Sequence, residues 1–142
     1  MAQLERQLAW DGCANVRDLG GHPTGDGGTT RSGSIVRADL IRRLTDSGWQ
    51  ALVEYGVRTI VDLRFQEELD ADPPAELPVE AVHVSLLGTI DDEYGTEIDA
   101  LARAAGSVAD GTKVVYVEFL ERFRSNFARV IRAIAEAPDG AV

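Results

Sequence analysis

Residues 44–64, LTDSGWQALVEYGVRTIVDLR, place a helix directly before a strand. Thr45 can cap the first free backbone N–H groups of the helix, and Asp46 suits the positive end of the helix dipole. Gly56 is a natural stop, because a helix commonly ends on a residue with positive φ. Residues 57–63 are β-branched and apolar, which is typical of a buried strand. A helix, a glycine and a short strand in this order form the second half of a β-α-β unit.

Further elements surround this unit on both sides. Residues 34–36 form a short apolar stretch that predicts a strand, and residues 82–86 alternate as a strand does. A helix is expected from Glu97 to Ala105. A single long helix is predicted by apolar residues at the 3, 4, 7 spacing of one helical face: Tyr116, Phe119, Leu120, Phe123, Phe127, Val130, Ile131 and Ile134. Tyr116 and Phe119 are expected in the core.

The chain end carries one more strand signal. The residues Pro138, Asp139 and Gly140 end the helix, and residues 141–142 look like the first two residues of another strand. We therefore predict a single α/β domain over residues 1–142, with a central, mostly parallel sheet flanked by helices.

Composition excludes several classes of protein. The 142 residues hold 14 basic and 24 acidic side chains, a formal net charge of −10, which argues against a binder of nucleic-acid backbones. An apolar fraction of 44% supports a packed core. No apolar run is long enough for a membrane span, and no secretion signal is evident, so a cytoplasmic location is expected. The lone Cys13 excludes an internal disulfide and a cysteine-based zinc site.

The negative charge is concentrated in one stretch. Residues 65–99 contain eleven acidic residues and neither Lys nor Arg. The simpler interpretation is a solvated acidic surface that keeps the protein in solution. The alternative is an electrostatic filter that repels anionic ligands or selects basic peptides.

Three clusters of polar residues are unusual for segments that only stabilise the fold. They are residues 15–21 (NVRDLGG), residues 36–40 (VRADL) and residues 62–64 (DLR), the last followed by Glu67 and Glu68. The third cluster ends a predicted strand, and ligands of open α/β sheets gather at the carboxyl ends of the strands.

These motifs, in this order and spacing, resemble the bacterial tyrosine/serine protein phosphatases, a branch of the cysteine-dependent phosphatases. The resemblance runs from Asn15 to Val142. It implies a phosphotyrosine-phosphatase-like fold and hydrolysis of phosphate monoesters on a phosphoprotein or a phosphorylated small molecule, without metal or cofactor. It also implies that a His-Cys-x5-Arg loop follows Val142, so that the chain is incomplete before this loop. Phosphotyrosine is the expected substrate, with phosphoserine as an alternative.

The resemblance also supplies candidate residues. We expect six residues to line the phosphate site or to support its loop: Asp62, Arg64, Arg37, Arg17, Asp18 and Glu67. Structural alternatives remain open for them. Arg17 and Asp18 can form a buried ion pair, Asp62 and Arg64 a structural salt bridge, and Glu67 can pair with Arg64 across a helical turn.

The remaining reactive residues are expected to be structural. Cys13 lacks an arginine six positions later, since position 19 is Leu, and we expect it to be incidental to chemistry. His22 and His83 are expected to face solvent or to be satisfied by hydrogen bonds.

Two functional hypotheses follow. In the first, the nucleophile loop comes from polypeptide after Val142 or from a second chain, and residues 1–142 alone are inactive. In the second, the chain is a non-catalytic phosphatase-like binding module. A rhodanese-like domain is a distant third, because the motifs do not point to it.

Overall fold

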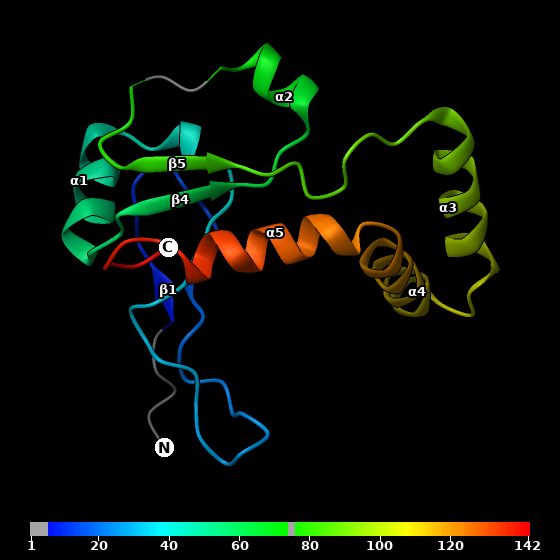
Figure 1. Cartoon of the computed structure of the whole chain (residues 1–142), viewed down its shortest axis with the longest axis horizontal. Coiled ribbons are helices and arrows are strands. Elements are labelled where there is room, and N and C mark those ends of the chain that lie inside the picture. The colour runs from blue at the N-terminus through cyan, green and yellow to red at the C-terminus, as the bar shows by residue number, and fades with distance from the viewer. Residues whose placement is uncertain (1–5, 74–75) are drawn as a thin grey trace. The chain divides into compact units, whose positions relative to one another are not determined.

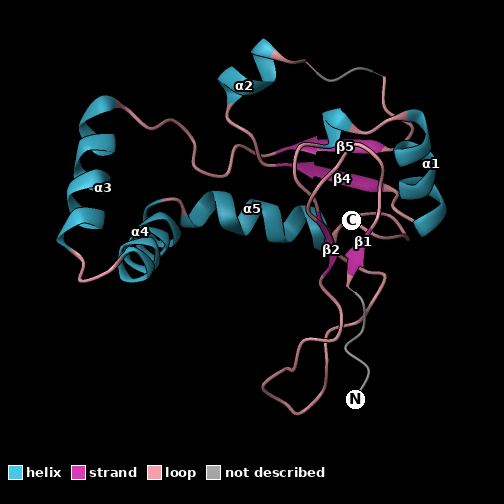
Figure 2. Cartoon of the chain, turned by 180° about the vertical axis from the view of Figure 1, so that it is seen from behind, coloured by secondary structure: helices cyan, strands magenta, loops and turns pink. Residues whose placement is uncertain are grey.

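The computed structural model describes residues 6–73 and 76–142 (Figures 1 and 2). Three strands open the chain, three helices close it, and helices and strands alternate only between them, in the order β1 Gln7–Leu8, β2 Val16–Asp18, β3 Val36–Arg37, α1 Asp46–Tyr55, β4 Thr59–Asp62, α2 Gln66–Ala71, β5 Glu80–His83, α3 Asp92–Ala104, α4 Val108–Arg122 and α5 Arg124–Ala135. A 3-10 turn, Ile41–Arg43, precedes α1. In its described residues the chain forms two compact units. The first comprises residues 6–61, 76–82 and 136–142, and the second comprises residues 62–73 and 83–135.

The predicted helix–strand unit is confirmed in the structure. The Thr45 hydroxyl oxygen accepts a hydrogen bond from the backbone N–H of Gly48 at 3.2 Å, and so caps α1. Gly56 ends the helix with φ of 103°, a conformation that favours glycine. The chain then enters β4 after only two more residues, Val57 and Arg58.

The strands form two small sheets. β1, β2 and β3 are paired antiparallel in that order, and β4 pairs with β5. The second pair is parallel, because the N–H of Glu80 donates to the carbonyl of Arg58 and the N–H of Val84 donates to the carbonyl of Asp62. The α/β class is confirmed, but the prediction of a mostly parallel sheet is met only in part. The sequence analysis predicted no strand in residues 6–18, but β1 and β2 lie there and form an antiparallel sheet with β3.

Residues 141–142 form the strand contact that the sequence predicts. Ala141 forms a parallel bridge with Val57. Backbone hydrogen bonds join the chain end to β3 on one side and to the start of β4 on the other: Val142 with Ser34 (3.0 Å) and Val36 (2.7 Å), and Ala141 with Gly56 (2.9 Å) and Arg58 (2.9 Å). The chain end therefore occupies the strand position between the two sheets.

The core of the first unit lies around this position. Its most buried side chains are apolar and come from the first and last segments of the unit: Trp10, Val16, Leu44, Leu52, Val57 and Ala141. Because each of them removes apolar surface from water, this cluster is the main stabilising contact of the unit.

The helices of the second unit differ from the prediction. α3 begins at Asp92, where the Asp91 side chain caps it, five residues before the expected start at Glu97. The single long helix is wrong. α4 ends at Arg122, and Phe123, with φ of −103° and ψ of 23°, interrupts the helical run before α5. The Phe123 ring packs edge-on against Tyr94 at a centroid distance of 5.9 Å, which anchors the break to α3.

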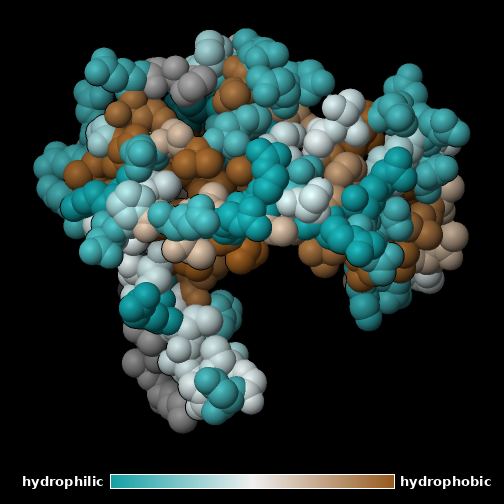
Figure 3. All heavy atoms as spheres, in the orientation of Figure 1, coloured by the Kyte–Doolittle hydropathy of each residue, from teal (hydrophilic) through white to brown (hydrophobic). Residues whose placement is uncertain are grey.

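The α3–α4 hairpin exposes much of its apolar surface, as the brown patches in Figure 3 show. Val108, Tyr116 and Leu120 are 89%, 62% and 50% exposed. The expectation that Tyr116 lies in the core is therefore wrong, because the interruption at Phe123 separates the two helices over which the apolar face was assumed to be continuous. No helix among the described residues is long and apolar enough to cross a membrane.

Candidate functional site

Asp62 and Arg64 form a tightly bonded pair where β4 ends. The Arg64 side chain donates from Nε to both Asp62 carboxylate oxygens (3.1 and 3.0 Å) and from Nη2 to Oδ2 (2.8 Å). Both side chains are 17% exposed. Burial raises the pKa of Asp62, but the hydrogen bonds from Arg64 outweigh it and hold the pKa below its ordinary value. The carboxylate is therefore ionised at neutral pH.

The rest of the Arg64 guanidinium is also engaged. Its Nη1 donates to the backbone carbonyl of Asp72 at 3.4 Å and lies 3.7 Å from the Asp72 carboxylate. The expected pair with Glu67 is not formed. α2 begins at Gln66, so Arg64 precedes the helix and the helical spacing does not apply to it, and Glu67 is exposed. This geometry favours a supporting role for Arg64 over direct contact with a ligand.

His83 belongs to the same strand ends. It closes β5, and its Nε2 donates to the backbone carbonyl of Arg64 at 2.9 Å. The expectation that His83 is satisfied by a hydrogen bond is confirmed. Its bond fixes the backbone of the residue that holds Asp62, so the end of β4 is held from two sides.

Asp18 is a second buried carboxylate, and it organises the glycine-rich loop of the first unit. It is 6% exposed and accepts hydrogen bonds from the N–H groups of Gly20 (2.7 Å) and Gly33 (2.8 Å) and from the Tyr55 hydroxyl (2.6 Å). Burial raises its pKa, and these three bonds lower it to a net value below normal. Tyr55 was not among the expected site residues, and burial together with Asp18 raises its pKa to about 12.

Arg17 and Asp18 do not form the expected ion pair. Successive side chains of a strand point to opposite faces, so Asp18 is buried while Arg17 is exposed. The Arg17 Nε donates instead to the Asn15 side-chain oxygen at 3.1 Å. Across the sheet, Arg17 lies directly opposite Arg37, which is also exposed.

Cys13 is half-buried beside the core of the first unit. Its thiol donates to the Leu40 carbonyl at 3.5 Å. Burial, followed by the nearby Asp39 carboxylate, raises the pKa of the thiol to about 11. Since the thiolate is the nucleophilic form, Cys13 is poorly suited to attack a substrate at neutral pH.

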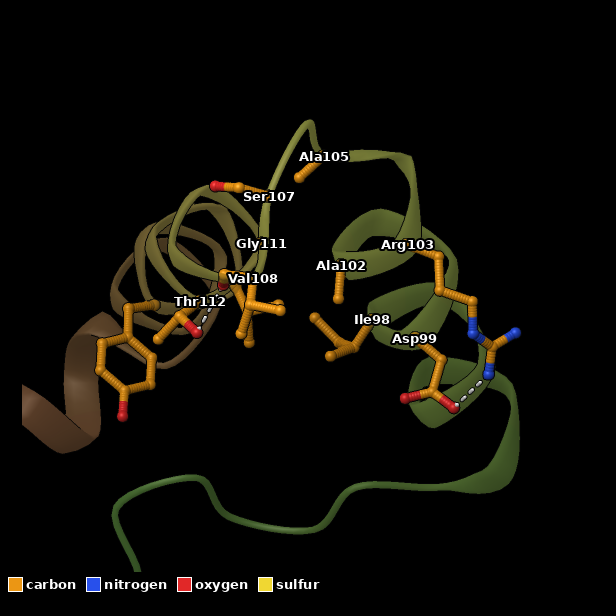
Figure 4. A pocket seen from close by; sticks show the side chains of 11 residues that line it. Ile98, Asp99, Ala102, Arg103, Ala105, Ser107, Val108, Gly111 and Thr112 are labelled. Carbon is orange, nitrogen blue, oxygen red and sulfur yellow. Dashed lines mark hydrogen bonds and ion pairs between the residues drawn. The ribbon is translucent and has the colours of Figure 1, made fainter.

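An open cavity of about 750 Å³ lies between α3 and α4 (Figure 4). Figure 4 shows Ile98, Ala102 and Val108 turned toward this space, with the Asp99–Arg103 ion pair at its edge. This lining is largely apolar, and its Ser107 and Thr112 hydroxyls donate within α4, to the Asp110 carboxylate and to the Val108 carbonyl. The cavity is therefore not the candidate site for chemistry.

Comparison with known proteins decides the family. The model of the tyrosine phosphatase family matches residues 8–142. The chain belongs to this family. It is also similar to a tyrosine-protein phosphatase of Nostoc commune, with 32% identity over 113 residues, which is 77% of this chain and 36% of that protein. The chain thus spans about a third of the length of this relative.

The family assignment sets the three polar clusters in context. In this tyrosine phosphatase family chain, two of the clusters use a buried carboxylate, Asp18 or Asp62, to hold a turn in place. The second cluster contributes Asp39, which accepts from the backbone N–H groups of Ala14 (3.2 Å) and Asn15 (3.4 Å). The acidic members of the motifs are therefore used internally. Arg17 and Arg37 are the arginines of these motifs that are exposed to solvent.

Proposed function

We propose that this chain is the scaffold of a protein-tyrosine phosphatase that hydrolyses phosphate monoesters through a phosphocysteine intermediate. The nucleophile loop would be supplied by polypeptide that follows Val142. The substrate would be a phosphoprotein or a phosphorylated small molecule, and a cytoplasmic location fits the charge and composition of the chain.

The position of the chain end carries this proposal. Ala141 and Val142 lie between β3 and β4, in parallel register with Val57. A strand that continued in this register would run along the free edge of β4, and the fifth residue after Ala141 would lie beside Asp62. Loops at the carboxyl ends of parallel strands are where α/β proteins bind ligands. The turn held by Asp62, Arg64 and His83 would then border the nucleophile loop.

The chemistry follows from such a loop. Its backbone N–H groups and an arginine would hold the phosphate oxygens and lower the pKa of a cysteine thiol. The thiolate attacks phosphorus, the bond from phosphorus to the leaving oxygen breaks, and an acid protonates that oxygen. Water then attacks the phosphocysteine, which releases inorganic phosphate and restores the thiolate. In this scheme Asp62 and Arg64 position the loop and do not touch the substrate.

The decisive experiment compares two lengths of the same protein. The reading frame continued beyond Val142 is expressed and assayed on a phosphotyrosine peptide, with its signature cysteine changed to Ser as the control. We expect turnover that the Ser variant loses. Absence of cysteine-dependent turnover would refute the proposal.

The chain of residues 1–142 is the matched control. Because the pKa of Cys13 is raised to about 11, we expect no cysteine-dependent turnover from this chain alone. If residues 1–142 showed phosphatase activity that Cys13→Ala abolished, Cys13 would be the nucleophile, and the proposal that the nucleophile follows Val142 would be wrong. A chain that binds phosphotyrosine in both lengths but never turns it over would support the non-catalytic module instead.

A further inference from the structure

Three polar side chains form a row across the exposed face of the first sheet. Gln7 of β1 is paired with Arg17 of β2, and Arg17 is paired with Arg37 of β3. Paired residues of neighbouring strands project from the same face, and all three side chains are exposed. The ladder hydrogen bond from the N–H of Leu19 to Ile35 continues the alternation, so Arg17 and Arg37 form a hydrogen-bonded pair with Cα atoms about 5.5 Å apart.

The two guanidinium groups are not neutralised by the described part of the chain. The Arg17 Nε is held by the neutral Asn15 side chain, which leaves both Nη groups open. Arg37 has no hydrogen bond or ion pair with any described residue. Asp39, two residues farther along, turns its carboxylate to the backbone N–H groups of Ala14 and Asn15.

This arrangement is unfavourable without a ligand. Like charges placed directly opposite across strands are destabilising. The chain carries a net charge of −10 and has 24 acidic side chains with which to pair its arginines, yet these two face each other. An anion between them would convert repulsion into two sets of charge-assisted hydrogen bonds, since each guanidinium offers a fork that matches two phosphate oxygens.

We propose that Arg17 and Arg37 form a binding site for a phosphate group. The choice of phosphate over another anion rests on the proposed function, whereas the site itself rests on the register of β2 and β3. The phosphate can be free phosphate or the phosphoryl group of a phosphotyrosine. The side-chain amides of Asn15 and Gln7 are neutral, so they can donate hydrogen bonds that orient the phosphate and do not neutralise the arginines.

Binding of inorganic phosphate to residues 1–142 tests this proposal directly, by isothermal titration calorimetry with NMR as a second readout. We expect saturable binding that weakens at least tenfold in Arg37→Gln and in Arg17→Gln. Arg129→Gln is the matched control, because Arg129 is exposed on α5 and its substitution removes the same charge from the chain. Arg37→Lys, which keeps the charge and loses the fork, is expected to bind with intermediate affinity.

The outcomes separate cleanly. An equal loss in all three Gln variants would show general electrostatic attraction and overturn the site, as would the absence of saturable binding by the unaltered chain. A second titration with phosphotyrosine distinguishes the two ligand sources, since tighter binding than inorganic phosphate indicates a substrate-borne group. Both arginines are exposed, so the variants are expected to fold, and unchanged tryptophan fluorescence verifies this. The titration measures no turnover, so it can succeed or fail independently of the phosphatase assay.

Discussion

Tyr55→Phe tests whether Asp18 holds the first unit together. The substitution removes one hydroxyl, which donates to the Asp18 carboxylate at 2.6 Å, and leaves the ring in place. The ring still meets Trp10 edge-on at a centroid distance of 6.0 Å, so the packing is preserved. Any loss of stability therefore reports the hydrogen bond alone.

The expected magnitude follows from the charge of the acceptor. A hydrogen bond to an ionised group contributes about 1.5–3 kcal/mol to the free energy of unfolding. Asp18 keeps its two backbone donors in the variant, so we expect a loss of about 2 kcal/mol. With a urea m-value of about 2 kcal/mol/M, the midpoint of unfolding would fall by about 1 M.

The pH dependence of this loss has a defined sign. The pKa of Asp18 is lower in the folded chain than in the unfolded chain. Its contribution is therefore present above about pH 4, the unfolded value, and is lost as the pH falls through the folded pKa. The pKa of Tyr55 is raised to about 12, so its contribution is present below about pH 10 and is lost as the pH rises toward 12. The difference between the two proteins should shrink at both extremes.

Tryptophan fluorescence during urea unfolding measures this effect, because Trp10 and Trp49 both belong to the first unit. Tyr116→Phe is the matched control, since the Tyr116 side chain is 62% exposed and its loss should change the stability by less than about 0.5 kcal/mol. A Tyr55→Phe effect below 0.5 kcal/mol at pH 7, or one that does not diminish as the pH is lowered from 4 through the range in which both proteins stay folded, would refute the role assigned to Asp18.

Three further predictions rest on single features. Arg64→Gln should cost about 3 kcal/mol, because it strands a largely buried carboxylate, and a thermal unfolding shift below 1 kcal/mol would contradict this. Gly12→Ala should cost at least about 1–3 kcal/mol, because φ at Gly12 is 94° and a Cβ would overlap the backbone oxygen of Arg43, whereas Gly25→Ala, with open space around it, should be nearly neutral in the same urea assay. Cys13 should react with iodoacetamide at pH 8 about tenfold more slowly than a thiol of pKa 9.0, because a pKa of about 11 lowers the thiolate fraction about 100-fold and the greater nucleophilicity of a more basic thiolate offsets only part of this loss, and a rate like that of free cysteine would contradict the raised pKa.

Local signals in the sequence predicted the centre of the fold. The Thr45 cap, the Gly56 stop and the β-branched run after it have their effects within a few residues, and α1 and β4 follow them closely. The strand signal at Ala141 was also correct, because an apolar pair after a turn needs a place in a sheet. The order of the polar motifs was sufficient to predict the family, which the comparison confirms.

Other features depend on contacts that spacing does not reveal. The apolar spacing continues on both sides of Phe123, so the sequence pattern does not show that the helix ends there and starts again. The break depends on how Phe123 packs against Tyr94, almost thirty residues earlier. Likewise, Arg64 pairs with Asp72 and not with Glu67, because the helix starts at Gln66, two residues after Arg64, and the helical spacing therefore does not apply to this pair.

The sequence contains the information that Arg17 and Asp18 do not form an ion pair. Residues two apart in a strand share a face and adjacent residues do not, a rule that correctly joined Asp62 with Arg64. Applied to Arg17 and Asp18, the same rule separates them, with the carboxylate in the core and the guanidinium outside. It would not have found Arg37 as the neighbour of Arg17, because that pairing depends on the register of two strands joined by a loop of 17 residues.

The separation of charges in the motifs bears on where an anion can bind. Asp18 is buried and Asp62 is largely buried, and both carboxylates are ionised and already accept several hydrogen bonds, so they stabilise turns and have little capacity left for a ligand. Arg64 is engaged through all three of its side-chain nitrogens. An anion therefore needs a positive group with free donors, and in the described part of the chain Arg17 and Arg37 are the motif arginines that have no hydrogen-bond partner on either Nη group.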